Sequence, residues 1–390
     1  MSNFGDMQNE VYFRGLSGER PALPVTAAGL EAAAKRTLNA EAYAYVAGSA
    51  STERTATANL AAFHAHRIVP RMWRGSAAAD GRDLRTTVLG ATLAAPVLTA
   101  PIGVLELVHA DAELAAAAAT NELGIGTVLS GASSVSIENV SAAAGDWWFQ
   151  LYWPSDDEVA RSLVERATAA GAGAIVVTAD TPGIGWRPRD LELAHLPFLQ
   201  AKGIANYLSD PVFRSKLAAP PEESEQAMQT AVLAWISMFA NHTLRTKDIA
   251  RVREWTHLPV VVKGVLHPDD ASELLDSGAS GVIVSNHGGR QVDGAIAALD
   301  ALPGVAATVK GRGAVLFDSG IRCGADVVIA LALGADAVLY GRPWVYGLAL
   351  AGQAGVEHAL RCLLADLDLT MALAGLRSIE EIDVGTLATL

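Results

Sequence analysis

The sequence predicts an α/β protein: a (β/α)8 TIM barrel with an N-terminal helical cap and a long insertion after the fourth strand. From about residue 85 the chain repeats a helix, a Gly-Ala or Gly-Ser pair, a short β-branched strand and a polar residue. Glycine after a helix end and continuously apolar strands are typical of parallel α/β units. Eight such strands can be counted, and eight parallel strands with intervening helices close into a barrel.

The eight predicted strands lie near residues 96–100, 126–130, 148–151, 174–178, 259–263, 281–285, 314–318 and 337–340. One helix start is also marked, because Ser155 and Glu158 form a capping-box pattern. In a barrel all strands end at one face, where the active site is built. Since polar residues follow every predicted strand, the pattern favours an enzyme over a purely structural barrel.

Two segments fall outside the repeat. Residues 1–85 are expected to form the cap, helical around 27–47, and residues 86–390 the barrel. Residues 191–247 form an insertion between the fourth strand and its helix that is too long for an ordinary connection. A lid over the barrel mouth and an oligomer contact are equally compatible with this insertion.

Composition narrows the range of partners. The chain has 390 residues and a net charge of −13, which disfavours nucleic acid and anionic membranes as partners. With only Cys323 and Cys362, neither a disulfide framework nor a metal site is expected. Residues 1–6 lack a signal-peptide pattern, and the uncharged stretch 86–105 is interrupted by glycine and proline, as two short strands would be. We therefore expect a soluble cytoplasmic protein.

The most informative motif is Ser-Asn-His-Gly-Gly-Arg-Gln at residues 285–291, directly after the sixth predicted strand. His287 can take up a proton near neutral pH, and Arg290 can bind a carboxylate through two parallel hydrogen bonds. The paired glycines allow close approach of another molecule. The motif suits removal of a proton beside a carboxylate, and a solvated turn is the alternative interpretation.

The residues that directly follow the last two predicted strands indicate a phosphate site. They are Asp318, Gly320 and Arg322 after the seventh strand, and Gly341 and Arg342 after the eighth. Loops at these two positions commonly bind phosphate in this kind of barrel. A phosphate-bearing cofactor is therefore favoured, whereas the absence of a G-x-G-x-x-G motif after the first strand disfavours a nicotinamide-binding domain.

A second group of strand-end residues suits a redox-active ring. Lys263 ends the fifth strand, and a buried lysine needs a counter-charge or a negative ligand. A ring that becomes anionic on reduction would serve, and Ser130, Gln150 and Thr178 could hydrogen-bond its polar edge. The pattern fits flavin mononucleotide (FMN).

These motifs resemble those of the FMN-dependent α-hydroxy acid oxidising family, and the resemblance covers essentially the whole chain. Residues 285–291 match the signature of that family. Within it the chain is most similar to lactate 2-monooxygenase, through residues 185–191, 198–199, 206–207 and 210–213. The resemblance implies FMN, a small 2-hydroxy acid and O2 as partners, and a homo-oligomer of four or eight chains.

The resemblance also assigns the chemistry to four polar residues. His287 would be the catalytic base, and Asp180 would hold its imidazole in the right orientation. Arg187 and Arg290 would bind the substrate carboxylate.

Tyr45 and Tyr152 would hydrogen-bond the carboxylate and hydroxyl of the substrate and take part in catalysis. The resemblance further implies a set of residues that hold the cofactor. These are Pro101, Ile102, Gly103, Ser130, Gln150, Thr178, Lys263, Ser285, Asp318, Gly320, Arg322, Gly341 and Arg342.

The insertion favours the monooxygenase outcome, in which lactate and O2 give acetate, CO2 and water. One alternative is an oxidase that releases a 2-keto acid and H2O2. Ala132 and residues 105–109 depart from relatives, so a substrate larger than lactate is also open. A catalytically silent FMN barrel is the alternative from another class, but it would be expected to lack one of Lys263, His287, Arg187 and Arg290, and all four are present.

Overall fold

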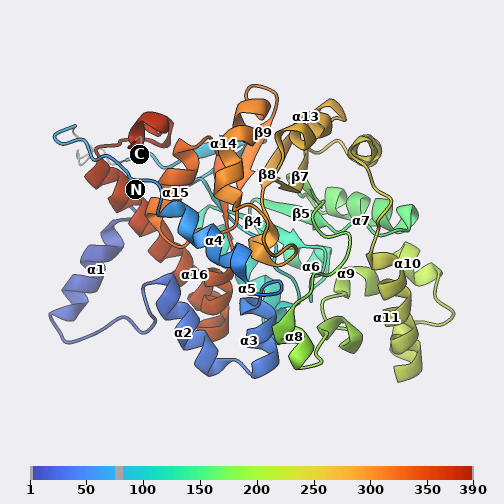
Figure 1. Cartoon of the computed structure of the whole chain (residues 1–390). Coiled ribbons are helices and arrows are strands. Elements are labelled where there is room, and N and C mark those ends of the chain that lie inside the picture. Colours follow the sequence, from blue (N-terminus) through green and yellow to red (C-terminus); the bar gives the residue numbers. More distant parts are fainter. Residues whose placement is uncertain (1–2, 75–81, 389–390) are drawn as a thin grey trace.

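A closed barrel of eight parallel strands lies at the centre of the computed structural model, which describes residues 3–74 and 82–388 (Figure 1). The strands are β3 (Val97–Thr99), β4 (Gly126–Ser130), β5 (Trp147–Leu151), β6 (Ile175–Thr178), β7 (Val260–Val265), β8 (Gly281–Val284), β9 (Ala314–Phe317) and β10 (Ala337–Tyr340). β10 pairs with β3 to close the barrel. The predicted fold and all eight strand positions are confirmed, while the expected outer limits at residues 1 and 390 lie outside the described residues.

Helices alternate with the strands and cover the outside of the barrel (Figure 1). They are α5 (Ala112–Leu123), α6 (Ile137–Ser141), α7 (Asp157–Ala169), α12 (Ile249–Trp255), α13 (Pro268–Asp276), α14 (Ala298–Val309), α15 (Gly324–Ala332) and α16 (Arg342–Ala374). The predicted cap of α7 is wrong, because Asp156 rather than Ser155 accepts the first free backbone N–H groups. The backbone N–H of Ser155 donates instead to the carbonyl of Met238, at 2.7 Å.

A short hairpin closes the N-terminal end of the barrel. β1 (Thr86–Val88) and β2 (Ala91–Leu93) pair antiparallel, so the stretch expected to hold two short strands holds three with β3. Val88 and Leu93 are buried with the inward-facing side chains of the barrel strands in one apolar cluster. Because this cluster fills the barrel interior, polar chemistry is confined to the opposite, C-terminal face.

The N-terminal segment contains α1 (Asp6–Gly15), α2 (Ala27–Thr37), α3 (Ala40–Ala47) and α4 (Arg54–Phe63). The helical stretch expected around 27–47 is two helices, because Asn39 caps the second and accepts a hydrogen bond from the backbone of Ala42 at 2.8 Å. The end of α3 reaches the barrel mouth, where the carbonyl of Gly48 accepts a hydrogen bond from Arg290. This contact brings Tyr45 to the C-terminal face.

α8 (Pro188–Glu192) leads into the insertion at the lower centre of Figure 1, and the insertion continues as α9 (Ala205–Leu208), α10 (Pro211–Ser215) and α11 (Glu225–Phe239) farther to the right. Trp235 is buried against both Phe198 and Phe239, with its ring centroid 4.7 Å from each of theirs. The buried carboxylate of Asp210 pairs with Arg166 of α7 at 3.1 Å and fastens the insertion to the barrel.

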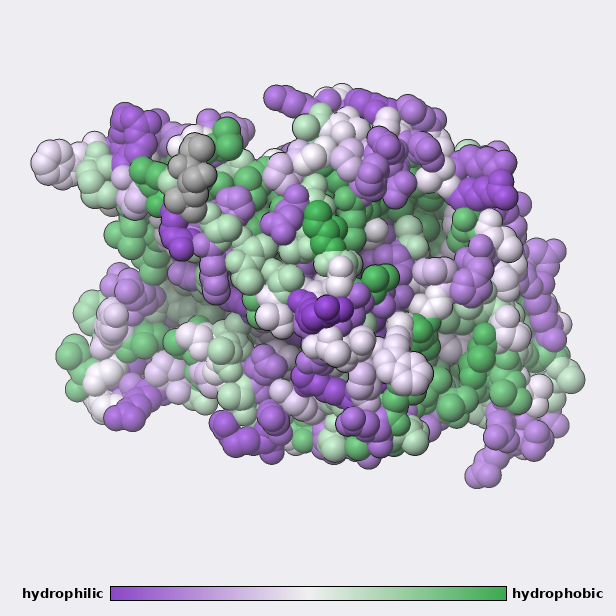
Figure 2. All heavy atoms as spheres, in the orientation of Figure 1, coloured by the Kyte–Doolittle hydropathy of each residue, from purple (hydrophilic) through white to green (hydrophobic). Residues whose placement is uncertain are grey.

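Hydrophobic and hydrophilic residues are interspersed over the face drawn in Figure 2, with hydrophobic ones gathered over α11, where Leu233 and Ile236 are exposed. Within the part of the chain that the structure describes, no helix is both long enough and apolar enough to cross a membrane.

Candidate active site

A cavity with an empty volume of about 1040 Å³ opens at the C-terminal ends of the strands, between the cap and the insertion. Cofactor sites of this barrel class lie at the same place. Most of the predicted site residues line the cavity: Tyr45, Pro101, Ile102, Gly103, Tyr152, Arg187, Lys263, His287, Arg290, Asp318, Gly320, Arg322, Gly341 and Arg342. The others lie next to it in the barrel wall: Ser130, Gln150, Thr178, Asp180 and Ser285.

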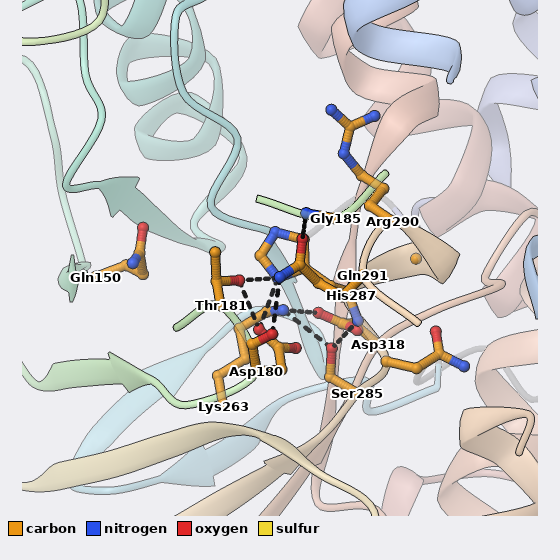
Figure 3. A network of polar contacts seen from close by, with 12 residues as sticks. Gln150, Asp180, Thr181, Gly185, Lys263, Ser285, His287, Arg290, Gln291 and Asp318 are labelled. Atoms are coloured by element: carbon orange, nitrogen blue, oxygen red, sulfur yellow. Dashed lines mark hydrogen bonds and ion pairs between the residues drawn. The ribbon is translucent and has the colours of Figure 1, made fainter. Parts of the chain in front are cut away.

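His287 and Asp180 form a pair at the floor of the cavity (Figure 3). Nδ1 of His287 lies 2.8 Å from Oδ1 of Asp180 and 3.2 Å from the hydroxyl of Thr181. His287 is held in the left-handed region at φ 58°, and its backbone N–H donates to Ser285 at 3.0 Å. With Nδ1 engaged by the carboxylate, the lone pair of a neutral imidazole is on Nε2, where it can accept a proton.

The electrostatics of the site favour a neutral His287 beside an ionised Asp180. Burial lowers the pKa of His287, Asp180 raises it, and the positive charges of Lys263 and Arg187 lower it further, with a net decrease. Burial alone would raise the pKa of Asp180, but His287 and Lys263 bring it below its usual value. A neutral imidazole beside an ionised carboxylate is therefore the resting arrangement near neutral pH, as a general base requires.

Lys263 lies beneath this pair and is almost completely buried. Its ammonium donates to Ser285 at 2.9 Å and pairs with Asp318 at 3.1 Å, and the three side chains meet in Figure 3. Burial would lower the pKa of Lys263, but Asp318 and Asp180 raise it overall. The cavity floor thus carries a fixed positive charge that can stabilise a developing negative charge above it.

Arg187 and Arg290 bring two further positive charges into the cavity. Arg187 donates to the carbonyl of Arg290 at 3.4 Å and to the amide of Gln291 at 3.2 Å. The Arg290 guanidinium donates to Gly48 at 2.5 Å and lies 5.4 Å from the ring centre of Tyr45. Burial and the neighbouring Arg290 lower the pKa of Arg187 to about 10. Across the described residues neither guanidinium forms an ion pair with a carboxylate, so both can bind an anionic ligand.

The remaining wall of the cavity is largely aromatic and apolar. The ring centroid of Tyr152 lies 6.5 Å from His287 and 5.4 Å from Phe239 of the insertion. Ala132 and Phe198 also line the cavity, whereas residues 105–109 do not. Of the two departures noted in the sequence, only Ala132 therefore lies where it can alter the space for a ligand.

The end of β5 presents an unpartnered amide. Gln150 is fully buried, and its Oε1 accepts from Ser130 at 3.1 Å and from the backbone of Gly131 at 3.2 Å. Its Nε2 has no hydrogen-bond partner among the residues that the structure describes. Buried polar groups are normally hydrogen-bonded, so this N–H group indicates a ligand with a polar edge. Thr178 is buried on the adjoining strand.

Arg342 and Arg322 mark the other end of the cavity, after β10 and β9. Arg342 is held by carbonyl groups, at 3.1 Å from each of Val46, Gly288 and Gly48, and burial lowers its pKa to about 10. Gly320 has φ 125°, and a Cβ there would lie 2.6 Å from the carbonyl oxygen of Asn59. The close packing of α4 thus explains this glycine, and the two arginines that line the cavity beside it can bind a phosphate.

Several residues of the site were not among the predicted site residues. Thr181 bonds both Asp180 and His287, and Ser319 accepts hydrogen bonds from the backbone of Asn286 and Gly288. Phe198 and Phe239 belong to the insertion, and they line the cavity because of the way the insertion folds. Thr181 and Ser319 each follow a predicted strand-end acid, and that position is the one signal that could have identified them.

The barrel and this site define a flavin-dependent oxidoreductase. A model of the FMN-dependent dehydrogenase family matches residues 34–389. The chain is 42% identical over 382 residues to an FMN-dependent alpha-hydroxy acid dehydrogenase, qulF, of Penicillium citrinum, covering 97% of this chain and 94% of that one. It is 39% identical over 391 residues to an L-lactate oxidase of Lysinibacillus sphaericus, covering 99% and 98%. A mandelate oxidase structure with benzoyl-formic acid has a TM-score of 0.81 at 36% identity, covering 94% and 98%.

The chain belongs to the FMN-dependent dehydrogenase family, and it is an oxidoreductase whose cofactor is FMN. The residues present fit this cofactor. Lys263 supplies positive charge, Gln150 a free amide N–H for a polar ring edge, and Arg322 with Arg342 two guanidiniums for a phosphate. The predicted family and cofactor are confirmed.

Proposed function

We propose that this chain oxidises L-2-hydroxy acids to 2-keto acids, with His287 as the base. The observation that carries the proposal is the position of His287, backed by Asp180 at 2.8 Å, in one cavity with Arg187 and Arg290. An ionised 2-hydroxy acid offers a carboxylate for the two guanidiniums and, one carbon away, the proton that the base removes. The names of the relatives, which include lactate and mandelate oxidases, support the same substrate class.

The side chains of the site have separate roles in the proposed reaction. Arg187 and Arg290 would neutralise and orient the carboxylate, and positioning of this kind can remove several kcal/mol of the barrier. Tyr45 and Tyr152 would donate hydrogen bonds to the carboxylate and hydroxyl. His287 would take up a proton on Nε2, and Asp180 would stabilise the resulting imidazolium, a step typically worth about 10² to 10⁴ in rate.

FMN, when bound, would accept the two electrons that leave the substrate and pass them to O2. Its phosphate would lie against Gly320, Arg322, Gly341 and Arg342. Its ring and ribityl chain would be held by the other predicted cofactor residues. These are Pro101, Ile102, Gly103, Ser130, Gln150, Thr178, Lys263, Ser285 and Asp318.

We infer that the outcome is of the monooxygenase type, with lactate converted to acetate, CO2 and water. Phe198 and Phe239 of the insertion line the cavity, so a folded insertion retains the keto acid beside newly formed peroxide. Retention favours oxidative decarboxylation before release. The second candidate is an oxidase that releases the keto acid and H2O2, and it is favoured by the relatives, which include an L-lactate oxidase and a mandelate oxidase.

The space beside Ala132 supports a substrate with a larger side chain than lactate. Ala132 lines the cavity together with Ile184 and the two insertion phenylalanines, and these side chains form an apolar wall. Such a wall suits an alkyl or aryl group on the α-carbon. We further propose that the protein is cytoplasmic and forms a homo-oligomer of four or eight chains. The insertion would then serve either as a lid over the cavity or as a contact between chains.

Aerobic turnover of the FMN-loaded protein tests this proposal. L-lactate, longer L-2-hydroxy acids and L-mandelate would be supplied in turn, and peroxide, keto acid and decarboxylated acid quantified together. Decarboxylated acid without peroxide is the expected result, whereas equimolar peroxide and keto acid would establish the oxidase. His287→Ala should retain FMN but not be bleached anaerobically by any of these acids, and normal bleaching of that variant would overturn the assignment of the base.

A further inference from the structure

A second, smaller cavity lies behind the FMN site, between α5, the end of β4 and the first turn of α16. It has room for about one water molecule. Its walls are mainly apolar, but Glu113, Ser130 and Trp344 also face it. Ile102 lines both this cavity and the active-site cavity, so the two spaces share a wall.

Glu113 joins the two loops that separate these cavities. Its Oε1 accepts the backbone N–H of Ser134 at 3.0 Å and that of Leu105 at 3.5 Å. Leu105 follows β3 in the loop that carries Ile102, and Ser134 follows β4 in the loop that carries Ala132. One carboxylate oxygen therefore ties together two segments that line the active site.

Two polar atoms at this cavity lack partners. Glu113 is 4% exposed and Trp344 is 2% exposed. Glu113 Oε2 and Trp344 Nε1 are both buried, and neither is hydrogen-bonded within residues 3–74 and 82–388. Burial raises the pKa of Glu113 to about 7, against the opposing effect of its backbone hydrogen bonds. When a buried acceptor and a buried donor without hydrogen-bond partners lie at one small cavity, a buried water molecule usually bonds to both.

We propose that this cavity holds an ordered water molecule that accepts from Trp344 Nε1 and donates to Glu113 Oε2, which makes Glu113 a positioning residue for the FMN site. The water links the two loops to the first turn of α16. That turn also carries Arg342, which lines the far end of the FMN cavity. Glu113 thus sets the spacing between the segments on either side of the cofactor.

The proposal depends on FMN binding in the cavity but not on the identity of the substrate, so it is tested with FMN alone. The dissociation constant of FMN would be measured by titrating the apoprotein of each variant. Glu113→Ala should raise it about tenfold, as the loss of buried hydrogen bonds can. Glu113→Gln should stay within about twofold, because its amide keeps the acceptor and gains a donor for the water. Glu122→Ala, on the exposed end of α5, is the matched control. An Ala variant no weaker than this control would overturn the positioning role.

The water bridge has its own test. Trp344→Phe removes the N–H and keeps most of the ring, so it should raise the FMN dissociation constant by about threefold. Combined with Glu113→Ala it should add almost nothing, because bridged partners are not additive. Additive effects would contradict the bridge, as would a crystal structure of the FMN-loaded protein with no water between the two side chains. Should Glu113→Ala fail to fold, Trp344→Phe and the crystal structure of the FMN-loaded protein test the bridge without it.

Discussion

The carboxylate of Asp180 occupies the space that a side chain on Gly264 would fill. A Cβ on Gly264 would lie 2.5 Å from Cβ, 2.6 Å from Cγ and 2.7 Å from Oδ2 of Asp180. Gly264 has φ 102° and lies at the irregularity in the pairing of β7 with β8, between Lys263 and Val265. One bend in β7 therefore aims Lys263 into the site and leaves room for the acid that orients His287.

Substitution of Gly264 should therefore act on catalysis rather than on cofactor binding. Gly264→Ala would displace Asp180 from His287 and should lower the rate of anaerobic flavin reduction by about 10- to 100-fold, part of what a positioned base contributes. Gly278→Ala is the matched control, since Gly278 also has a positive φ, 99°, but its Cβ would meet only Arg253, at 3.5 Å. Equal losses in the two variants would show that backbone strain alone is responsible.

The pH dependence of turnover should follow His287. Burial lowers its pKa, Asp180 opposes this, and Lys263 lowers it again. Only the neutral ring can accept a proton, so activity is present above this lowered pKa and is lost as the pH falls through it. Asp180→Asn removes the negative charge that raises the pKa, so the acid limb of kcat/KM should move to lower pH while the plateau falls by about 10² to 10⁴. A limb that moves to higher pH would contradict this assignment.

Substitution of Arg342 should weaken the binding of FMN but not that of riboflavin. If its guanidinium faces the phosphate, Arg342→Ala should weaken FMN binding at least about tenfold, the loss of one charge-assisted hydrogen bond or more. Riboflavin, which lacks the phosphate, should bind both proteins almost equally. Arg361→Ala, which removes an exposed charge farther along α16, serves as the control. A parallel loss of riboflavin affinity would indicate that Arg342 matters for the loops it bonds rather than for the phosphate.

Ala132 should set the size of the accepted acid. Ala132→Leu adds volume to the cavity wall, so kcat/KM for L-mandelate should fall more than about tenfold while that for L-lactate changes little, since overpacking costs about 1–3 kcal/mol. The ratio of the two values is the measurement, because it cancels any general loss of active protein. An unchanged ratio would place the substrate side chain elsewhere in the cavity.

The barrel was predictable because the strands are mostly apolar and most of them carry a polar residue at or near their end, a pattern that depends only on local sequence. The pairing of Asp180 with His287 was reached only by resemblance, since 107 positions separate the two residues. Phe239 could not be predicted at all, because its approach to Tyr152 depends on how the insertion packs around Trp235. Asn39 did carry a visible cap signal between α2 and α3, but the alanine-rich, helix-favouring stretches on both sides of it hid the break.

The hairpin of β1 and β2 has a kinetic consequence. Because Val88 and Leu93 close the far end of the barrel, substrate and product must both use the mouth of the active-site cavity, next to the insertion. Product would then leave through the mouth by which the next substrate enters, and its release can limit turnover however fast the base works.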